Sequence, residues 1–182
     1  MKIRVDDLKD KTVELSSEEP LALYSTLLAL QEAGECRFQA PLRIHLIIAR
    51  EYDHIRVSGR VETSIRLDCS RCLAEFQLCI DSPFTIFYMR DEGLGQDEDV
   101  ELAEEDLISA TYEGDEIDFT SEITEQVILA IPLKPLCSED CKGLCSNCGA
   151  ELNISNCACS QDNMNLQFNA LKNLKVKKIK ER

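Results

Sequence analysis

The sequence contains no tryptophan, and aromatic residues make up only 5% of its 182 residues. So few rings argue against an extended platform on which nucleic-acid bases stack. Basic residues are also few relative to acidic ones. The sequence has 20 lysines and arginines but 34 aspartates and glutamates, which gives a net charge of −14. This imbalance disfavours indiscriminate binding to nucleic acid or to an anionic membrane surface.

Motifs that would indicate a membrane protein or an enzyme are missing too. No apolar stretch is long enough to cross a bilayer, and residues 1–7 lack the apolar segment of a secretion signal. We also find no glycine-rich nucleotide loop, no Ser/His/Asp set and no isolated carboxylate pair. We therefore expect a cytoplasmic protein that is not an enzyme and has no small-molecule substrate.

The composition still supports a folded chain, because 44% of the residues are hydrophobic. The charge is uneven: residues 172–182 carry six basic residues against Glu181 alone. We predict an α+β domain over residues 1–132, a cysteine-rich metal-binding module with a short helix over 133–171, and a basic tail over 172–182.

Three long strands are predicted by alternating apolar and polar side chains. Residues 42–48, 55–67 and 76–88 each place their apolar residues on one face and polar residues on the other. Because the connections are short, we expect an antiparallel sheet or a partly closed barrel from residue 36 to 90. Pro83 indicates a bulge or an edge position in the third strand.

Shorter elements are expected before the sheet. Ile3 lies in a short opening strand. The segment from Ser16 and Ser17 to Pro20 has the pattern of a helix start, and the predicted helix runs to about Leu30.

After the sheet, residues 91–106 are rich in acidic side chains and indicate a solvated loop. Residues 108–119 predict one more strand pair or a short strand. A helix should then begin with Thr120 or Ser121 as its cap and end before Pro132.

The most distinctive stretch of the chain runs from residue 137 to 159, which holds six of the ten cysteines: Cys137, Cys141, Cys145, Cys148, Cys157 and Cys159. Too few apolar residues lie here to order the segment by burial alone. Cys145 and Cys148, followed by Gly149, have the knuckle spacing that directs two thiolates at one tetrahedral ion.

Clustered cysteines in a chain without a secretion signal indicate zinc rather than disulfides, and the spacing fits neither common ferredoxin pattern. We expect four of the six cysteines to bind about one zinc per chain. Cys145 and Cys148 are the first two ligands. Cys157 and Cys159 are slightly favoured over Cys137 and Cys141 as the other two.

A second pair, Cys69 and Cys72, falls between the second and third predicted strands, at the tip of a hairpin. The pair could supply metal ligands, alone or with the later cysteines. It could form a recognition turn in which Arg71 contacts a phosphate or carboxylate. A redox pair is disfavoured because a hairpin tip lacks a helix dipole, and inward-packed thiols are the remaining alternative. Cys36 and Cys79 are expected to be packing residues.

Arginines on the polar face of the predicted sheet could contact RNA phosphates: Arg56, Arg60 and Arg66, with Arg43 and Arg50 nearby. Cross-strand pairing with glutamates explains the same arginines equally well. Lys177 and Lys178 in the basic tail are further candidates for RNA contact.

The cysteine motifs resemble those of the bacterial YceD family. The resemblance rests on Cys69-Ser-Arg-Cys72-Leu-Ala-Glu-Phe76, on Cys141-Lys-Gly-Leu-Cys145-Ser-Asn-Cys148-Gly-Ala-Glu-Leu-Asn153 and on Cys157-Ala-Cys159. The sequence departs from the family pattern after the cluster, where Asn165-Leu-Gln167 replaces a usual Asp-Pro-Arg.

This resemblance implies a cytosolic protein required for accumulation of large-subunit ribosomal RNA, without catalytic activity. Its partner would be that RNA or a ribosomal protein of the large subunit. Some relatives keep the hairpin pair but lack the later cysteines, which implies two independent elements. A zinc-binding protein–protein adaptor is the alternative function, and a thiol-redox protein using Cys69 and Cys72 is a weaker one.

Overall fold

The computed structural model describes residues 1–8, 12–52, 54–90 and 109–159. Their elements in chain order are β1 (Lys2–Arg4), η1 (Val5–Leu8), β2 (Val13–Glu19), η2 (Leu21–Leu23), α1 (Ser25–Glu32), β3 (Arg37–Phe38), β4 (Leu42–Glu51), β5 (His54–Asp68), β6 (Glu75–Arg90), β7 (Ser109–Tyr112), β8 (Glu116–Asp118) and α2 (Thr120–Ala130). No helix within these described ranges has both the length and the apolar character needed to span a bilayer.

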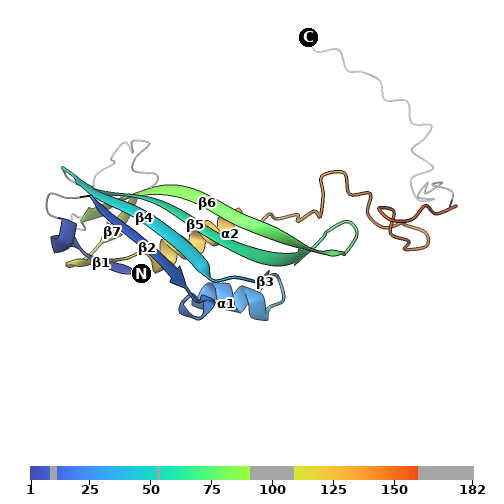
Figure 1. The fold of residues 1–182 in the computed structure, drawn as a ribbon, viewed down its shortest axis with the longest axis horizontal. Helices are drawn as coiled ribbons and strands as arrows, with labels where there is room; N and C mark the ends of the chain where they lie inside the picture. Colours follow the sequence, from blue (N-terminus) through green and yellow to red (C-terminus); the bar gives the residue numbers. More distant parts are fainter. Residues whose placement is uncertain (9–11, 53, 91–108, 160–182) are drawn as a thin grey trace, which may run out of the picture.

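The fold is built on an open sheet in the order β2-β4-β5-β6-β7, with β3 paired to β5 (Figure 1). Each of the strands β2, β4, β5 and β6 is antiparallel to its neighbour, and β7 runs parallel to β6. The predicted α+β class with an antiparallel sheet is therefore confirmed, and the sheet does not close into a barrel. The three long predicted strands correspond to β4, β5 and β6.

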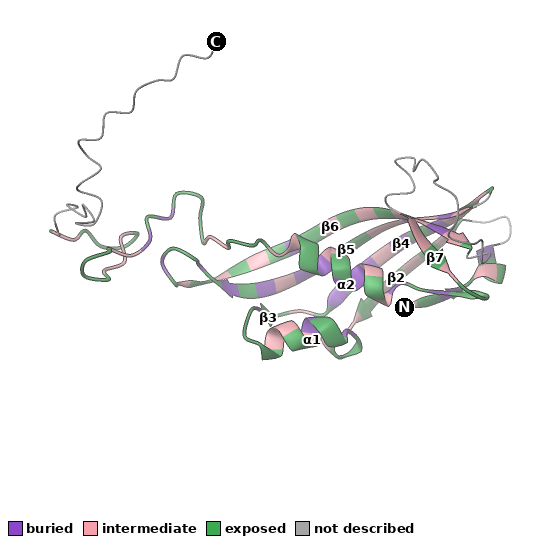
Figure 2. Ribbon diagram, turned by 180° about the vertical axis from the view of Figure 1, so that it is seen from behind, coloured by how far each residue is buried: buried purple, intermediate pink, exposed green. Residues whose placement is uncertain are grey.

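One face of this sheet forms the core. Alternate side chains such as Leu46, Val57 and Ile65 are fully buried on this inner face. The helix α2 packs against it with Ile123 and Val127, so buried residues lie between helix and strands (Figure 2). The opposite, outer face is polar, as the alternation predicted.

The prediction of a helix starting at Ser16 is wrong, because residues 13–19 form strand β2. Val13 and Leu15 alternate with polar residues, and the whole segment pairs with β4 from Val13↔Ile48 to Glu19↔Leu42. Pro20 keeps an extended backbone, with ψ 147°, and the helix begins only at Ser25. The Ser-Ser-Glu-Glu-Pro pattern is also compatible with an edge strand, and pairing with β4 decides between the two.

Two further details after the sheet differ from the prediction. The strands β7 and β8 do not pair with each other, because β7 joins β6 and β8 joins β1. The N-cap of α2 is Phe119 rather than Thr120 or Ser121, and the Asp118 carboxylate accepts hydrogen bonds from the Thr120 N–H (3.1 Å) and hydroxyl (2.6 Å). The Thr120 N–H belongs to the first turn of α2 and has no acceptor within the helix, so the Asp118 carboxylate supplies one.

Other predictions meet the structure in part. Pro83 lies at a regular position of β6, opposite Arg60, and the register there shows no bulge. Cys36 is buried as expected, but Cys79 is exposed because it points to the outer face. The predicted acidic loop, the basic tail and the short helix, which the spacing of Leu166, Ala170, Leu171 and Leu174 predicts, lie outside the described residues.

Strand β5 carries a glycine at a crowded position on the inner face. The ring of Phe84 lies directly over Gly59, and an added Cβ would also come within 2.7 Å of Leu46 Cδ2. We predict that Gly59→Ala lowers the free energy of unfolding by about 1–3 kcal/mol, because overpacking displaces these side chains. Urea denaturation measures the effect, with Ser64→Ala on the outer face of the same strand as the control. Equal stability of the two variants would contradict the predicted packing.

Candidate metal centre

The long β5–β6 hairpin extends beyond the helices and ends at the cysteine-rich segment (Figure 1). Residues 133–159, here called the cysteine module, have little regular structure and follow directly from α2. Pro135 accepts a hydrogen bond from the Ser70 N–H at 2.8 Å, and Leu144 N–H donates to the Arg71 carbonyl at 3.2 Å. Backbone contacts therefore fix the module against the hairpin tip.

Four thiols meet at this contact and form what we call the hairpin group: Cys69, Cys72, Cys137 and Cys141. All four sulfur atoms lie within 4.8 Å of one another. The Sγ atoms of Cys69 and Cys141 are 3.7 Å apart, and those of Cys72 and Cys137 are 3.6 Å apart. Four sulfurs at about 2.3 Å from one tetrahedral ion would be separated by about 3.8 Å. The hairpin group therefore has the dimensions of a single-ion site.

The other four thiols of the module form a second set, the knuckle group: Cys145, Cys148, Cys157 and Cys159. Their sulfur atoms also lie within 4.8 Å of one another. The turn between Cys145 and Cys148 is closed by a hydrogen bond from the Gly149 N–H to the Cys145 carbonyl at 2.8 Å, with Gly149 at φ 72°. This positive φ is what the Cys-x-x-Cys-Gly pattern required.

Hydrogen bonds to sulfur favour thiolates in both groups. Burial acts to raise the pKa of Cys69, but N–H groups of Cys137, Cys72 and Arg71 outweigh it and lower this pKa to about 6. In the knuckle group, N–H groups of Cys148 and Asn147 lower the pKa of Cys145 to about 6. Donors of this kind stabilise the deprotonated sulfur that binds a metal ion.

Other thiols in each group hold their protons more tightly. Hydrogen bonds to the sulfurs of Cys141 and Cys72 raise the pKa of Cys137 to about 12. A hydrogen bond to Cys148 does the same for Cys159, whose pKa also rises to about 12. Neighbouring sulfurs thus share protons, because several negative charges this close repel one another unless a cation lies between them.

The structure differs from the sequence prediction in the number of sites. One set of four was expected among the six later cysteines, whereas eight cysteines form two sets of four. The knuckle group is the set that the spacing favoured. Cys137 and Cys141 join the hairpin pair instead, so the expectation that the hairpin and the cluster are independent is wrong. Sequence spacing alone does not reveal this, because the partners lie 65 and 72 residues apart.

Arg71 has partners that the sequence did not indicate. Its guanidinium donates to the carbonyl oxygens of Cys141 at 2.8 Å and Glu139 at 3.3 Å. Gly143, at φ 75°, comes so close to the hairpin that an added Cβ would lie 3.0 Å from the Arg71 carbonyl oxygen. These contacts hold the cysteine module on the hairpin, and a role for Arg71 in contacting a phosphate or carboxylate stays a prediction.

The arginines of the outer sheet face are paired with acidic residues. Arg56 contacts Glu51 at 2.6 Å, Arg60 contacts Asp81 at 3.4 Å and Arg66 contacts Glu75 at 3.7 Å. Of the two explanations from sequence, the contacts match cross-strand pairing. Lys177 and Lys178 lie outside the described residues.

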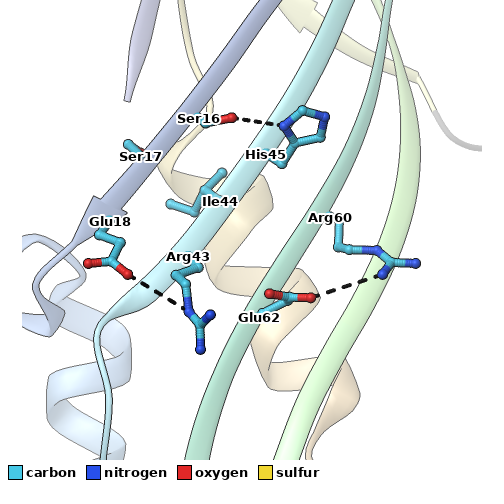
Figure 3. Close-up of a pocket in the computed structure, with 8 residues that line it drawn as sticks. All are labelled: Ser16, Ser17, Glu18, Arg43, Ile44, His45, Arg60 and Glu62. Atoms are coloured by element: carbon cyan, nitrogen blue, oxygen red, sulfur yellow. Dashed lines mark hydrogen bonds and ion pairs between the residues drawn. The ribbon is translucent and has the colours of Figure 1, made fainter.

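A shallow hollow of about 440 Å³ lies on the same face, across β2, β4 and β5 (Figure 3). Charged side chains lining it also lie in opposite pairs: Arg43 faces Glu18 at 3.9 Å, and Arg60 faces Glu62 at 4.0 Å. His45 accepts or donates a hydrogen bond with Ser16 at 2.9 Å. The hollow therefore offers balanced charge rather than a site for an anion.

The sequence was compared with protein families, with curated proteins and with solved structures. The chain matches the family model described as "Large ribosomal RNA subunit accumulation protein YceD" over residues 57–175, which include both cysteine groups. No solved structure matches the fold.

Three relatives illustrate the similarity. Proteins named "Large ribosomal RNA subunit accumulation protein YCED homolog 1, chloroplastic" from Arabidopsis thaliana and Zea mays are each 30% identical, over 74% and 69% of this chain. An uncharacterised protein of Mycobacterium leprae is 26% identical over 72% of this chain. The match covers 49%, 51% and 60% of these relatives, so the chain spans about half the length of the plant proteins. The chain therefore belongs to the YceD family, whose family model and plant relatives are named for the accumulation of large-subunit ribosomal RNA.

Proposed function

We propose that this protein is a non-enzymatic factor for biogenesis of the large ribosomal subunit, and that it binds zinc in both cysteine groups. Family membership supports the ribosomal role. Two sets of four sulfurs at single-ion separations support zinc, because closed tetrahedral sites of four thiolates are typical of structural zinc. The zinc ions would fix the cysteine module on the hairpin rather than take part in chemistry.

The partner that fits best is a basic ribosomal protein of the large subunit, bound where the hairpin meets the module. The observation that carries this choice is a set of exposed apolar side chains at that end: Leu73 (68% exposed), Leu133 (107%) and Ile154 (82%). Leu73 and Leu133 each lie within two residues of a contact between hairpin and module, and Ile154 follows Asn153, whose side chain contacts Cys141 of the hairpin group. Exposed apolar residues held on an ordered surface are typical of protein interfaces.

Charge supports a protein partner over bare RNA. The chain carries a net charge of −14, and a zinc ion bound by four thiolates adds further negative charge. The arginines that would contact phosphates are already paired with carboxylates. The negative charge attracts a basic polypeptide and repels RNA. RNA phosphates would also have to displace the carboxylates from these arginines, which a basic polypeptide need not do.

Binding measurements with purified, zinc-loaded protein test this proposal. Large-subunit ribosomal proteins and fragments of the ribosomal RNA are titrated separately, at two salt concentrations. Changing Leu73, Leu133 and Ile154 to serine should weaken binding to a ribosomal protein by at least about tenfold, because buried apolar anchors dominate interface energies. Tyr52→Ser is the matched control, because Tyr52 is fully exposed at the opposite end of β5.

The same experiment separates the two kinds of partner. Changing Arg56, Arg60 and Arg66 to glutamate should leave binding to a ribosomal protein unchanged. Tight, strongly salt-dependent binding to RNA that this variant abolishes would overturn the choice of a protein partner.

The lowered pKa of Cys69 would also fit a second function, thiol-redox activity. The same N–H donors, however, are those that stabilise a metal-bound thiolate, so the lowered pKa does not distinguish the two functions. The presence of Cys137 and Cys141 around the hairpin pair favours metal binding. A redox pair needs only two sulfurs, one of which must be accessible to its substrate. Cys69 is fully buried.

A further inference from the structure

Asn153 lies in the knuckle group's loop but contacts the hairpin group. It belongs to the segment between Cys148 and Cys157, which are both members of the knuckle group. Its amide nitrogen Nδ2 donates to the sulfur of Cys141, a member of the hairpin group, at 3.3 Å. Its amide oxygen Oδ1 accepts from the Lys142 N–H at 2.8 Å. One side chain thus joins the two groups.

The orientation of this amide follows from its partners. A backbone N–H can only donate, so Lys142 requires the amide oxygen, and the nitrogen is then directed at the sulfur. An N–H donor at 3.3 Å from sulfur is a favourable partner for the deprotonated thiolate that binds a metal ion. The contact is therefore suited to a thiolate at Cys141.

The loop that carries Asn153 is held close to the hairpin group by its backbone. Leu144 and Glu151 form an isolated antiparallel bridge, and the Leu152 N–H donates to the Gly143 carbonyl at 2.9 Å. The ends of the loop are the knuckle cysteines themselves. An ion in the knuckle group would fix both ends and hence the position of Asn153.

We propose that Asn153 couples the two cysteine groups, so that metal bound in the knuckle group strengthens metal binding in the hairpin group. The proposal rests on the zinc binding proposed above and goes beyond it. Donors to a ligand's free lone pairs orient that ligand and stabilise its charged form, and removing them typically lowers metal affinity about 10–100-fold. Coupling of this kind is reciprocal, so an ion in the hairpin group also favours the knuckle group.

The test is zinc titration of the full, reduced chain against a chromophoric chelator. Asn153→Ala removes both contacts of the amide. Asn153→Asp keeps the oxygen for Lys142 but places a carboxylate oxygen, which cannot donate, next to the sulfur. Asn156→Ala, three residues along the same exposed loop, is the matched control. Both Asn153 variants should weaken the hairpin group by about tenfold or more, while Asn156→Ala leaves it unchanged.

Disabling one group at a time assigns the effect. With Cys157 and Cys159 changed to serine, the hairpin group should weaken to a similar degree, and adding Asn153→Ala should then change little. With Cys69 and Cys72 changed to serine, Asn153→Ala should leave the affinity of the knuckle group unaltered, because the Cys141 contact no longer supports a second ion.

Each alternative result has a distinct meaning. If Asn153→Ala weakens the hairpin group and Asn153→Asp does not, the oxygen contact with Lys142 carries the effect, and the proposed donor role is overturned. Two ions bound with independent affinities would overturn the coupling alone. A chain that binds no metal would overturn both this inference and the zinc binding proposed above.

Discussion

Replacing Cys69 and Cys72 together with serine is expected to lower the zinc content from about two ions per chain to about one. The hairpin group would keep only the thiols of Cys137 and Cys141, which cannot close a tetrahedron around one ion. The knuckle group retains all four sulfurs and should still fill when zinc is in excess. Elemental analysis of the purified, desalted protein measures the change.

The control for this variant is Cys79→Ser, because Cys79 is exposed and belongs to neither group of four. It should keep about two ions per chain. Loss of both ions from the Cys69 and Cys72 variant at saturating zinc would mean that the eight cysteines form one inseparable site. Retention of both ions would remove the hairpin cysteines from the metal centre.

Removal of zinc by a strong chelator is expected to unfold the cysteine module while the sheet stays folded. Ordering the backbone costs about 1–2 kcal/mol per residue. Apolar packing around the hairpin group is limited to a few side chains, such as Leu136 and Leu144. Structural zinc supplies about 10–16 kcal/mol of apparent binding energy near neutral pH, which offsets that cost. The sheet has a core of its own, on its inner face.

Trypsin cleavage provides the measurement. Lys142 is exposed, and its N–H is held by Asn153 in the folded module. Cleavage after Lys142 should become at least about tenfold faster on chelation, because a protease cuts the locally opened segment. Cleavage after Arg60, in the middle of β5, should stay slow. Equal acceleration at both residues would show that the metal sites and the sheet unfold as one unit.

Local patterns in the sequence were sufficient for the long strands and for half of the metal centre. The alternation that predicted β4, β5 and β6 arises because successive side chains of a strand point to opposite faces, which any short segment displays. The knuckle pair Cys145 and Cys148 was equally visible, because both ligands come from one turn. Membership in the YceD family was also apparent from its cysteine motifs.

Elements that depend on distant partners were decided by the tertiary structure. Residues 13–19 became a strand through hydrogen bonds to β4, although their sequence resembles a helix start. The strands β7 and β8 follow one another in the chain but pair with β6 and β1. Periodicity reports how a segment is buried, but it does not specify which other segment covers or pairs with it.

The sequence by itself predicted an antiparallel sheet, a cysteine-rich segment and one set of four cysteines, built on Cys145 and Cys148, that could hold a metal ion. Only the tertiary structure decided that there are two groups of four thiols and that one of them joins the module to the hairpin. The physical reason is the separation of the ligands. Cys69 and Cys72 lie beside Cys137 and Cys141 because the β5–β6 hairpin holds the first pair at its tip and α2 leads the chain back toward that tip (Figure 1).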